Sequence, residues 1–360
     1  MAKGKLVVGL DIGSTSVKMV QLKEIRKRGE YGYALHSFGM KPLPPEAIVD
    51  GALMNTTAIV QAIRELVAEL KIKQREVAIG VSGHSVIIKK ISMPRMTQSE
   101  LEESIQWEAE QYIPFDVKDV NIDTQILNPD ANDATGQMDV LLVAAKKDMI
   151  NDYTTVVSEA GLIPGVVDVD AFAVQNMFYV NYDIASRETV VLINAGASVV
   201  NINIITDGMT VFTRDVTLGG NQFTEEIQKQ LNVSYEEAEA LKIGGGSQDA
   251  DSVVPQEVER VIGGVAEQVA GEIQRSLDFY AGTAADASFS KVYISGGTAK
   301  IPALFKTIEN RVGVPVEILN PFKNVEVDER RFDPGFLMDI APVAAVGVGL
   351  ALRKLGDKQE

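Results

Sequence analysis

One short pattern occurs twice in this chain, and it constrains the fold more than any other feature. Residues 7–17 read VVGLDIGSTSV, and residues 190–200, which lie 183 positions later, read VVLINAGASVV. An internal repeat at this spacing predicts two structurally related halves. The alignment needs no gap and pairs the following residues: Asp11 with Asn194, Gly13 with Gly196, and Thr15 with Ser198.

Each copy of the repeat predicts two strands joined by a tight turn with a glycine at its tip. Glycine allows a sharp turn and the close approach of a ligand. Successive N–H groups in such a turn can form an anion-binding concavity, and small hydroxyl side chains add donors. A single turn of this kind is more often a plain hairpin, but two copies at matching positions favour a site that holds a polyphosphate from both sides.

The segment between the two copies contains a block with its own pattern. Residues 84–162 alternate between strand and helix periodicity in the order β-α-β-β-α, which predicts an inserted subdomain. Helical spacing of apolar residues also predicts helices at 57–70, 258–280 and 341–352. The charged stretch 23–30 is expected to be a solvated hairpin tip, since it is too short for a nucleic-acid surface.

The composition excludes several classes of function. The net charge of −16 argues against non-specific nucleic-acid binding, which needs a basic surface. The absence of cysteine excludes disulfides, thiolate nucleophiles and iron–sulfur clusters, and two histidines are too few for a histidine-rich metal site. No secretion signal and no apolar run of membrane-spanning length is visible, so we expect no direct membrane insertion.

Five motifs together resemble those of a known superfamily. Residues 9–18 (GLDIGSTSVK) and 194–198 (NAGAS) resemble the two phosphate motifs of the actin, sugar-kinase and heat-shock-chaperone ATPases. Residues 294–302 (ISGGTAKIP) resemble the adenosine motif, whereas 168–173 and 341–352 resemble the two connecting helices. The motifs follow the order of that superfamily. The resemblance implies an α/β, actin-like fold, which is a duplicated ribonuclease-H-like fold of two domains.

The resemblance also implies a division of the chain. The first actin-like domain is expected to comprise residues 1–187 and 341–360 and to contain the inserted subdomain at 84–162. The second domain is expected at 188–340, with a small helical and loop subdomain at about 222–275.

Further motifs resemble one branch of the superfamily. The position of the insertion, GGNQFT at 219–224 and the AExxK pattern at 238–242 resemble the bacterial FtsA branch. The phrases MPRM at 93–96 and WEAEQYIPF at 107–115 are similar to the PilM family of type IV pilus proteins. FtsA carries a C-terminal amphipathic membrane helix, and the mostly polar residues 353–360 therefore favour PilM.

The PilM resemblance implies a cytoplasmic ATP-binding adaptor of the type IV pilus inner-membrane assembly platform, with a role in twitching motility. Such a protein is peripheral to the membrane through its partners and captures the N-terminal cytoplasmic peptide of PilN. The expected groove lies between the first and the inserted subdomains, where an extended peptide can add main-chain hydrogen bonds. Other inner-membrane and motor proteins of the pilus are further partners that the resemblance allows, and nucleic acid is not among them.

No groove residue can be assigned from the sequence. Met93, Met96 and Trp107 are apolar, but we expect such residues to be core rather than partner-binding.

The resemblance assigns residues to ATP and to magnesium. Asp11 would organise the ion, through water because magnesium keeps much of its hydration shell. Glu239 and Lys242 face the ribose and base in the FtsA branch, although a solvated helix face fits them equally well without the resemblance. The residues expected to hold phosphates are Gly13, Ser14, Thr15, Lys18, Gly196, Ala197 and Ser198. Asp11, Asn194, Gly219 and Gly220 are further expected cofactor-binding residues. The expected nucleoside-binding residues are Glu239, Lys242, Gly296, Gly297 and Thr298.

The resemblance leaves the question of catalysis open. Asp170 falls near the position that orients the attacking water in relatives, but it fits a helix N-cap equally well. Asn194 stands where hydrolysing relatives usually carry an aspartate, and an amide cannot act as a base. We therefore expect slow hydrolysis at most, with ATP as a ligand that closes the two halves. A filament-forming scaffold like FtsA is one alternative. An ATP-dependent small-molecule kinase is the other, but the sequence shows no sugar pocket or general base for it.

Overall fold

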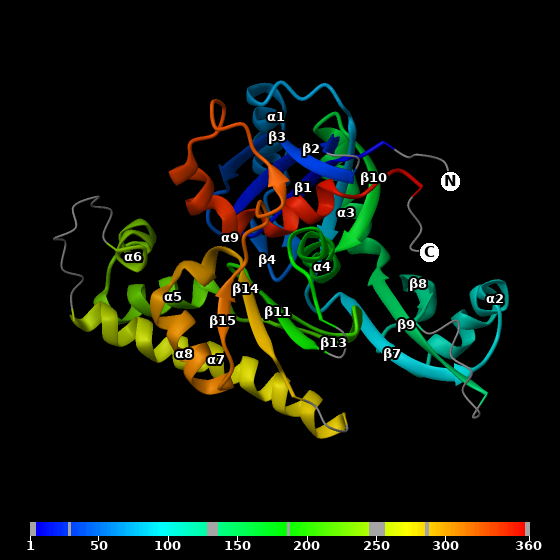
Figure 1. The fold of residues 1–360 in the computed structure, drawn as a ribbon. Coiled ribbons are helices and arrows are strands. Elements are labelled where there is room, and N and C mark those ends of the chain that lie inside the picture. Colours follow the sequence, from blue (N-terminus) through cyan, green and yellow to red (C-terminus); the bar gives the residue numbers. More distant parts are fainter. Residues whose placement is uncertain are drawn as a thin grey trace.

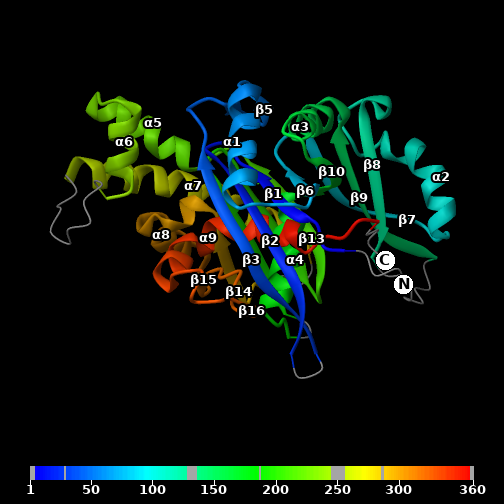
Figure 2. The ribbon, with the colours of Figure 1, turned by 90° about the horizontal axis from the view of Figure 1, so that it is seen from above.

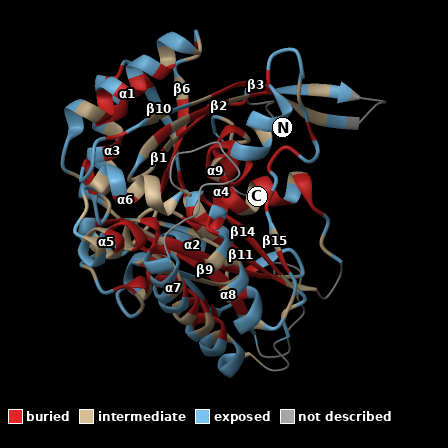
Figure 3. Ribbon diagram, turned by 90° about the vertical axis from the view of Figure 1, so that its left-hand side faces the viewer, coloured by how far each residue is buried: buried red, intermediate tan, exposed pale blue. Residues whose placement is uncertain are grey.

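The computed structural model places two α/β halves side by side and a smaller lobe next to the first half (Figure 1). The two helices α4 and α9 and the central strands of both sheets are largely buried, as Figure 3 shows. The structure describes the following residues: 5–27, 30–127, 136–185, 188–244, 256–284 and 288–356.

The sheet of the first half has six strands in the order β10-β6-β1-β2-β3-β16. In its centre, β1 pairs antiparallel with β2 and parallel with β6. A short hairpin and helix α1 connect β3 to β6. The elements are β1 (Val8–Ile12), β2 (Ser16–Lys27), β3 (Glu30–Pro42), β4 (Ile48–Val49), β5 (Ala52–Leu53), α1 (Thr56–Glu69), β6 (Glu76–Val81), β10 (Ile163–Val169) and β16 (Val325–Glu326).

The charged stretch at 23–30 is more regular than the sequence indicated. Residues 23–27 continue β2 and pair antiparallel with β3, so the stretch belongs to a hairpin, as expected, but residues 23–27 are paired strand rather than a solvated tip. Residues 28 and 29 lie outside the described residues.

The sheet of the second half repeats the order of the first. Its strands run β13-β12-β11-β14-β15, with β11 antiparallel to β12 and parallel to β14. These are the relations of β1 to β2 and β6, and the duplication that the repeat predicts is therefore confirmed. The strands are β11 (Thr189–Ala195), β12 (Val200–Thr206), β13 (Met209–Val216), β14 (Lys291–Ser295) and β15 (Val316–Ile318).

The helices of the second half lie largely on the opposite side of the molecule from the inserted sheet (Figure 2). Val265, Val269 and Ile273 of α7 pack into the core of the second sheet. The helices are α5 (Gly220–Leu231), α6 (Tyr235–Lys242), α7 (Gln256–Thr283), the 3-10 turn η2 (Gly297–Lys300) and α8 (Pro302–Val312).

The inserted lobe follows the expected order β-α-β-β-α and has its own core. Its three strands are arranged β7-β9-β8, and α2 buries Leu101, Ile105 and Ala109 against them. The capping box of Thr97 and Glu100 starts α2, which ends at Ala109. The elements are β7 (Val86–Pro94), α2 (Gln98–Ala109), η1 (Val117–Asp119), β8 (Val120–Ile126), β9 (Gln137–Lys146) and α3 (Lys147–Glu159).

Two side chains of the lobe differ in burial. Met93 is in the core of the lobe, as expected, but Trp107 is 79% exposed. The spacing explains this result, because Trp107 lies on the face of α2 opposite to Leu101, Ile105 and Ala109. Helix α3 packs its buried side, including Tyr153, into the core of the first half, and Leu141 and Ala145 of the inserted sheet belong to the same core cluster.

Helices α4 (Asp170–Asn181) and α9 (Pro334–Ala351) pack against each other between the two sheets. Asp333 caps α9, which starts at Pro334 rather than at residue 341, so the domain boundary expected at 340 falls within one helix. Among the described residues, α9 alone has the length and mean hydropathy, 1.6, of a membrane span. Of its span-length window, 61% is buried in this fold, as in the core helix of a folded domain.

Candidate functional site

A cleft of about 1500 Å³ lies between the two halves, and both copies of the repeat line it. The β1–β2 turn contributes one wall, and the β11–β12 turn contributes the other. Nearly all of the residues assigned to the nucleotide from the sequence meet here: Asp11, Gly13, Ser14, Thr15, Lys18, Asp170, Asn194, Gly196, Ala197, Ser198, Gly220, Glu239, Lys242, Gly296, Gly297 and Thr298.

The two turns have the same internal hydrogen bond. In the first, the Gly13 amide donates to the Ser16 carbonyl at 3.1 Å, and in the second, the Gly196 amide donates to the Val199 carbonyl at 2.9 Å. The duplication therefore extends from sequence to backbone conformation. Each turn brings backbone N–H groups and hydroxyl side chains to the same cleft, as an anion site requires.

The first wall contains an ion pair. Lys18 Nζ on β2 lies 3.1 Å from Asp11 Oδ2 on β1, and each side chain is only 12% exposed. The two residues are direct cross-strand neighbours, so strand register brings them together. An ammonium group at this position adds positive charge beside the turn.

Asp170 lies beside this pair at the start of α4. Val169 is the N-cap residue, no side chain caps the helix, and the N-cap alternative for Asp170 is thus wrong. The carboxylate of Asp170 instead fills the space beside Gly80, where a Cβ atom would lie 2.1 Å from its Oδ1. Burial, reinforced by the charge of Asp11, raises the pKa of Asp170 to about 7, against a smaller opposing effect of the Ser82 hydrogen bond.

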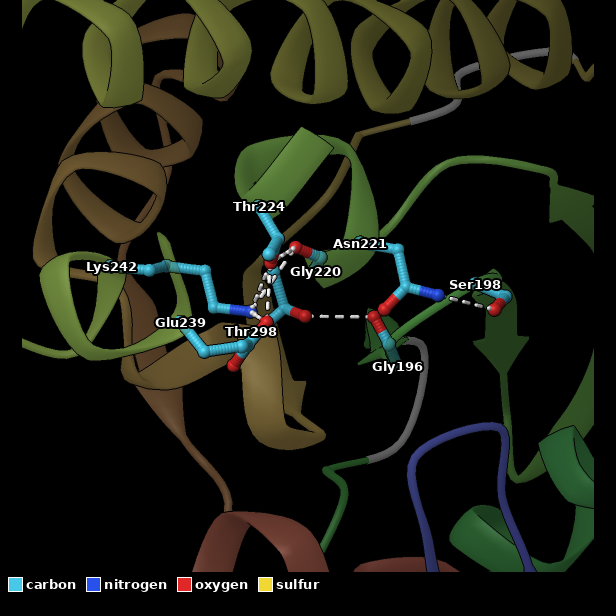
Figure 4. Close-up of polar contacts among 8 residues, drawn as sticks. All are labelled: Gly196, Ser198, Gly220, Asn221, Thr224, Glu239, Lys242 and Thr298. Atoms are coloured by element: carbon cyan, nitrogen blue, oxygen red, sulfur yellow. Dashed lines mark hydrogen bonds and ion pairs between the residues drawn. The ribbon is translucent and has the colours of Figure 1, made fainter. Parts of the chain in front are cut away.

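The second wall is a network around the second turn (Figure 4). The Gly196 carbonyl accepts hydrogen bonds from the Gly220 amide at 3.0 Å and from Thr298 Oγ1 at 2.7 Å. Asn221 Nδ2 donates to Ser198 Oγ at 3.1 Å. The turn is thereby fastened to both α5 and η2.

Helix α6 joins the same network through Lys242 (Figure 4). Lys242 Nζ donates to the Gly220 carbonyl at 3.3 Å and to Thr224 Oγ1 at 2.9 Å, and it forms an ion pair with Glu239. Thr224 also donates to Glu239. Glu239 and Lys242 therefore lie on the cleft side of α6, and the alternative of a solvated helix face is wrong for them.

Two glycines support the wall by allowing close approach. Gly219 does not line the cleft, because it is buried behind the turn, where a Cβ atom would lie 2.5 Å from the Gly196 and Ala197 carbonyl oxygens. Gly296 has φ +88°, and a Cβ atom there would lie 2.2 Å from the Ala195 oxygen. Its amide donates to the Pro342 carbonyl of α9 at 2.7 Å, which joins the second half to this helix.

Sequence reasoning missed Tyr153 and Asn201, which line the cleft, and Asp215, which accepts a hydrogen bond from Asn201. Burial, and then the charges of Asp170 and Asp11, raise the pKa of Tyr153, so its phenol stays protonated near neutral pH. Asn201 on β12 lies opposite Asn194, and Asp215 on β13 lies opposite Asn201. Burial raises the pKa of Asp215, and hydrogen bonds from Asn201 and Gly83 oppose the rise. Only strand register and packing reveal these neighbours.

The donor set fits magnesium held through water and nucleotide phosphates. Asp11, Asp170 and Asn194 present oxygen atoms, which are the ligands that magnesium prefers. Within the described ranges there is no group of three or more histidine, cysteine or acidic side chains that could hold an ion directly. The pKa of Asp170 is raised by burial and by the neighbouring Asp11 carboxylate, and a bound cation would relieve this repulsion.

The duplicated sheets, the paired turns and the two packed connecting helices define an actin-like α/β protein. Comparison with known families narrows this class further. A family model described as "Type IV pilus assembly protein PilM" matches residues 9–355, and the chain belongs to this family.

Individual relatives agree with that assignment. The PilM–PilN type IV pilus biogenesis complex contains a chain that superposes with a TM-score of 0.86 at 29% identity, covering 97% of this chain and 98% of that one. The cell division protein FtsA of Enterococcus hirae is 23% identical over 89% of this chain and 79% of its own length. MreB5 of Spiroplasma citri, solved with AMPPNP, matches with a TM-score of 0.50 at 13% identity over 96% of this chain and 94% of that one, which shows the fold alone.

Proposed function

We propose that the chain is the actin-like adaptor of a type IV pilus inner-membrane assembly platform, which binds ATP in the cleft and the N-terminal peptide of PilN elsewhere. The observation that carries the nucleotide proposal is the pair of equivalent turns facing one cleft from two halves. The structural match to a chain of the PilM–PilN complex extends over nearly the whole of this chain, and it supports PilN as the partner.

Each wall has a role in this proposal. The N–H groups and hydroxyls of the two turns would bind the phosphates, and Lys18 would add charge. Asp11 would hold magnesium through water, and the ion would neutralise phosphate charge. Glu239, Lys242 and Thr298 would bind the nucleoside, since all three lie on the α6 and η2 side of the cleft.

ATP acts here mainly as a ligand that closes the cleft, with slow hydrolysis at most. Asn194 cannot accept a proton as an aspartate can. Asp170, with a pKa of about 7, is the remaining candidate for orienting a water molecule. A ligand that contacts both halves stabilises the state in which they are close together.

We place the PilN peptide in the groove between the first half and the inserted lobe, with the protein at the cytoplasmic side of the membrane through this partner. The edge strand β10 supports this placement. It bears two exposed apolar residues, Ile163 at 54% and Val167 at 37%, as a strand-adding peptide would need.

The test is a calorimetric titration of the full chain with a synthetic peptide copying the PilN N-terminus, with and without Mg-ATP. We expect saturable one-to-one peptide binding and, in a separate titration, ATP binding that Asp11→Ala removes. Asp183→Ala, at an exposed aspartate, is the matched control and should bind ATP as the parent does. Intact ATP binding with no peptide binding in either condition would overturn the adaptor and favour a filament-forming scaffold.

A further inference from the structure

Three polar side chains form a row across the second sheet at the cleft. Asn194 on β11, Asn201 on β12 and Asp215 on β13 are direct cross-strand neighbours. Asn194 Nδ2 donates to Asn201 Oδ1 at 2.9 Å, and Asn201 Nδ2 donates to Asp215 Oδ1 at 2.8 Å. The row is therefore a continuous chain of hydrogen bonds that ends in a carboxylate.

The equivalent row in the first half has its charged side chains on different strands. There the cross-strand neighbours are Asp11, Lys18 and Met40. The acidic group is on the inner strand in the first half, but on the outer strand in the second. The carboxylate absent from position 194 thus has a counterpart two strands away, connected through Asn201.

The carboxylate at the end of this row determines the donor and the acceptor in each hydrogen bond between the side chains. Since it only accepts hydrogen bonds, Asp215 makes Asn201 turn its nitrogen outward and its oxygen toward Asn194. Asn194 must then donate to Asn201, and its own oxygen is directed away from that neighbour. Ser295 Oγ lies 3.4 Å from this oxygen and 3.3 Å from the Ile193 carbonyl, so its single hydrogen has two acceptors in reach, and Asn194 Oδ1 is one of them.

The second oxygen of Asp215 reaches the junction with the inserted lobe. Gly83, between β6 and β7, donates its amide hydrogen to Asp215 Oδ2 at 2.5 Å. Strand β13 also lies alongside β7. One carboxylate therefore contacts both the wall of the nucleotide cleft and the connection to the inserted lobe.

We propose that Asp215 is a positioning residue of the nucleotide site, which directs the Asn194 oxygen toward the bound metal–nucleotide and connects this wall to the inserted lobe at Gly83. The proposal rests on the proposed binding of Mg-ATP in the cleft. It adds a charged residue to the site on a strand that none of the nucleotide motifs includes.

Asp215→Asn is the discriminating variant, because Asn201 and Gly83 donate to different oxygens of Asp215, and asparagine keeps an acceptor at only one of these two positions. Either the Gly83 contact is lost, or the Asn201 and Asn194 amides reverse. We expect the affinity for Mg-ATP to fall about tenfold, the effect of one hydrogen bond to a charged group. The backbone amide resonance of Gly83 should also move in a ¹⁵N–¹H spectrum.

A second substitution provides the rescue. In Asp215→Asn with Asn194→Asp, Asn201 can donate to position 194 and accept from position 215, so all partners are satisfied again. We expect Mg-ATP affinity to return to within about threefold of the parent, a difference well below one hydrogen bond. Asp183→Asn removes a charge at an exposed position and should change neither readout.

The outcomes separate the two proposals. A folded Asp215→Asn variant with parental affinity and an unmoved Gly83 resonance would overturn the role of Asp215 while leaving nucleotide binding intact. A double variant as weak as the single variant would also overturn it. A parent chain that binds no Mg-ATP would overturn the proposed function, and the positioning role with it.

Discussion

Asp170 carries the strongest electrostatic perturbation that bears on function at the residue scale. Its pKa of about 7 lies above the ordinary value of 3.8, since burial and Asp11 disfavour the ionised form. The folded state therefore holds this proton more tightly than the unfolded chain. The free energy of unfolding consequently falls as the pH rises from about 4 to about 7.

Asp170→Asn should remove this decrease in the free energy of unfolding with rising pH, because asparagine cannot ionise. We expect the variant to be more stable than the parent by at least about 1 kcal/mol near pH 8, with the difference shrinking as the pH falls and approaching zero only below about pH 4. Thermal melts of both proteins across this pH range, without nucleotide, provide the measurement. A difference that does not vary with pH would contradict the raised pKa of Asp170.

Small residues set the distance between packed elements at the scale of helices and strands. Helix α9 crosses α4 so closely that a Cβ atom on Gly349 would lie 1.8 Å from the Ala173 carbonyl oxygen. On β1, a Cβ atom on Gly9 would lie 2.2 Å from the carbonyl oxygen of Gly347 in α9. Both contacts are with backbone, which cannot rotate away as a side chain can.

Gly349→Ala should therefore be costly, although alanine is the better helix former. We expect a loss of about 3 kcal/mol or more in the free energy of unfolding from overpacking. Gly263→Ala in α7 is the matched control, because nothing lies within 4 Å of a Cβ atom there. The control should gain roughly 0.5–1 kcal/mol from helix propensity. Chemical denaturation of both variants measures the contrast, and equal effects would contradict the tight crossing.

At the scale of the whole molecule, the cleft separates two halves that one ligand would connect. A ligand that binds only the folded state adds about 2.7 kcal/mol of stability at a concentration of 100 times its Kd. We expect Mg-ATP to raise the melting temperature by a few degrees, and Asp11→Ala to abolish the shift. Scanning calorimetry tests this, and a shift that persists in Asp11→Ala would place the nucleotide elsewhere.

The contact of Asp215 with Gly83 also predicts communication between the cleft and the inserted lobe. Mg-ATP should change the affinity for the PilN peptide by about fivefold or more, within the usual range of coupling between sites. Asp215→Asn should bring this factor close to one. Peptide titrations with and without Mg-ATP measure it, and Asp183→Asn, with unchanged coupling, is the control. Undiminished coupling in Asp215→Asn would show that another route connects the sites.

Much of the fold and most of the cleft could be predicted because they are encoded in consecutive residues. The repeat around Gly13 and Gly196 specifies two turns, and its spacing specifies two halves. Helical periodicity indicated α7 and most of α9, although not the start of α9 at Pro334. A turn depends on a few neighbouring backbone angles, so a short segment contains the information for it.

Only the tertiary structure decided the features that depend on long-range packing. The row from Asn194 to Asp215 requires the register of three strands, and the exposure of Trp107 requires knowing which face of α2 meets the inserted sheet. The raised pKa of Asp170 depends on burial beside Asp11, which is distant in sequence. The sequence by itself determined the duplicated fold and the two turns that line the cleft. The charges, partners and burial of the side chains around those turns were decided by packing, since they depend on residues that meet only when the halves and the inserted lobe come together.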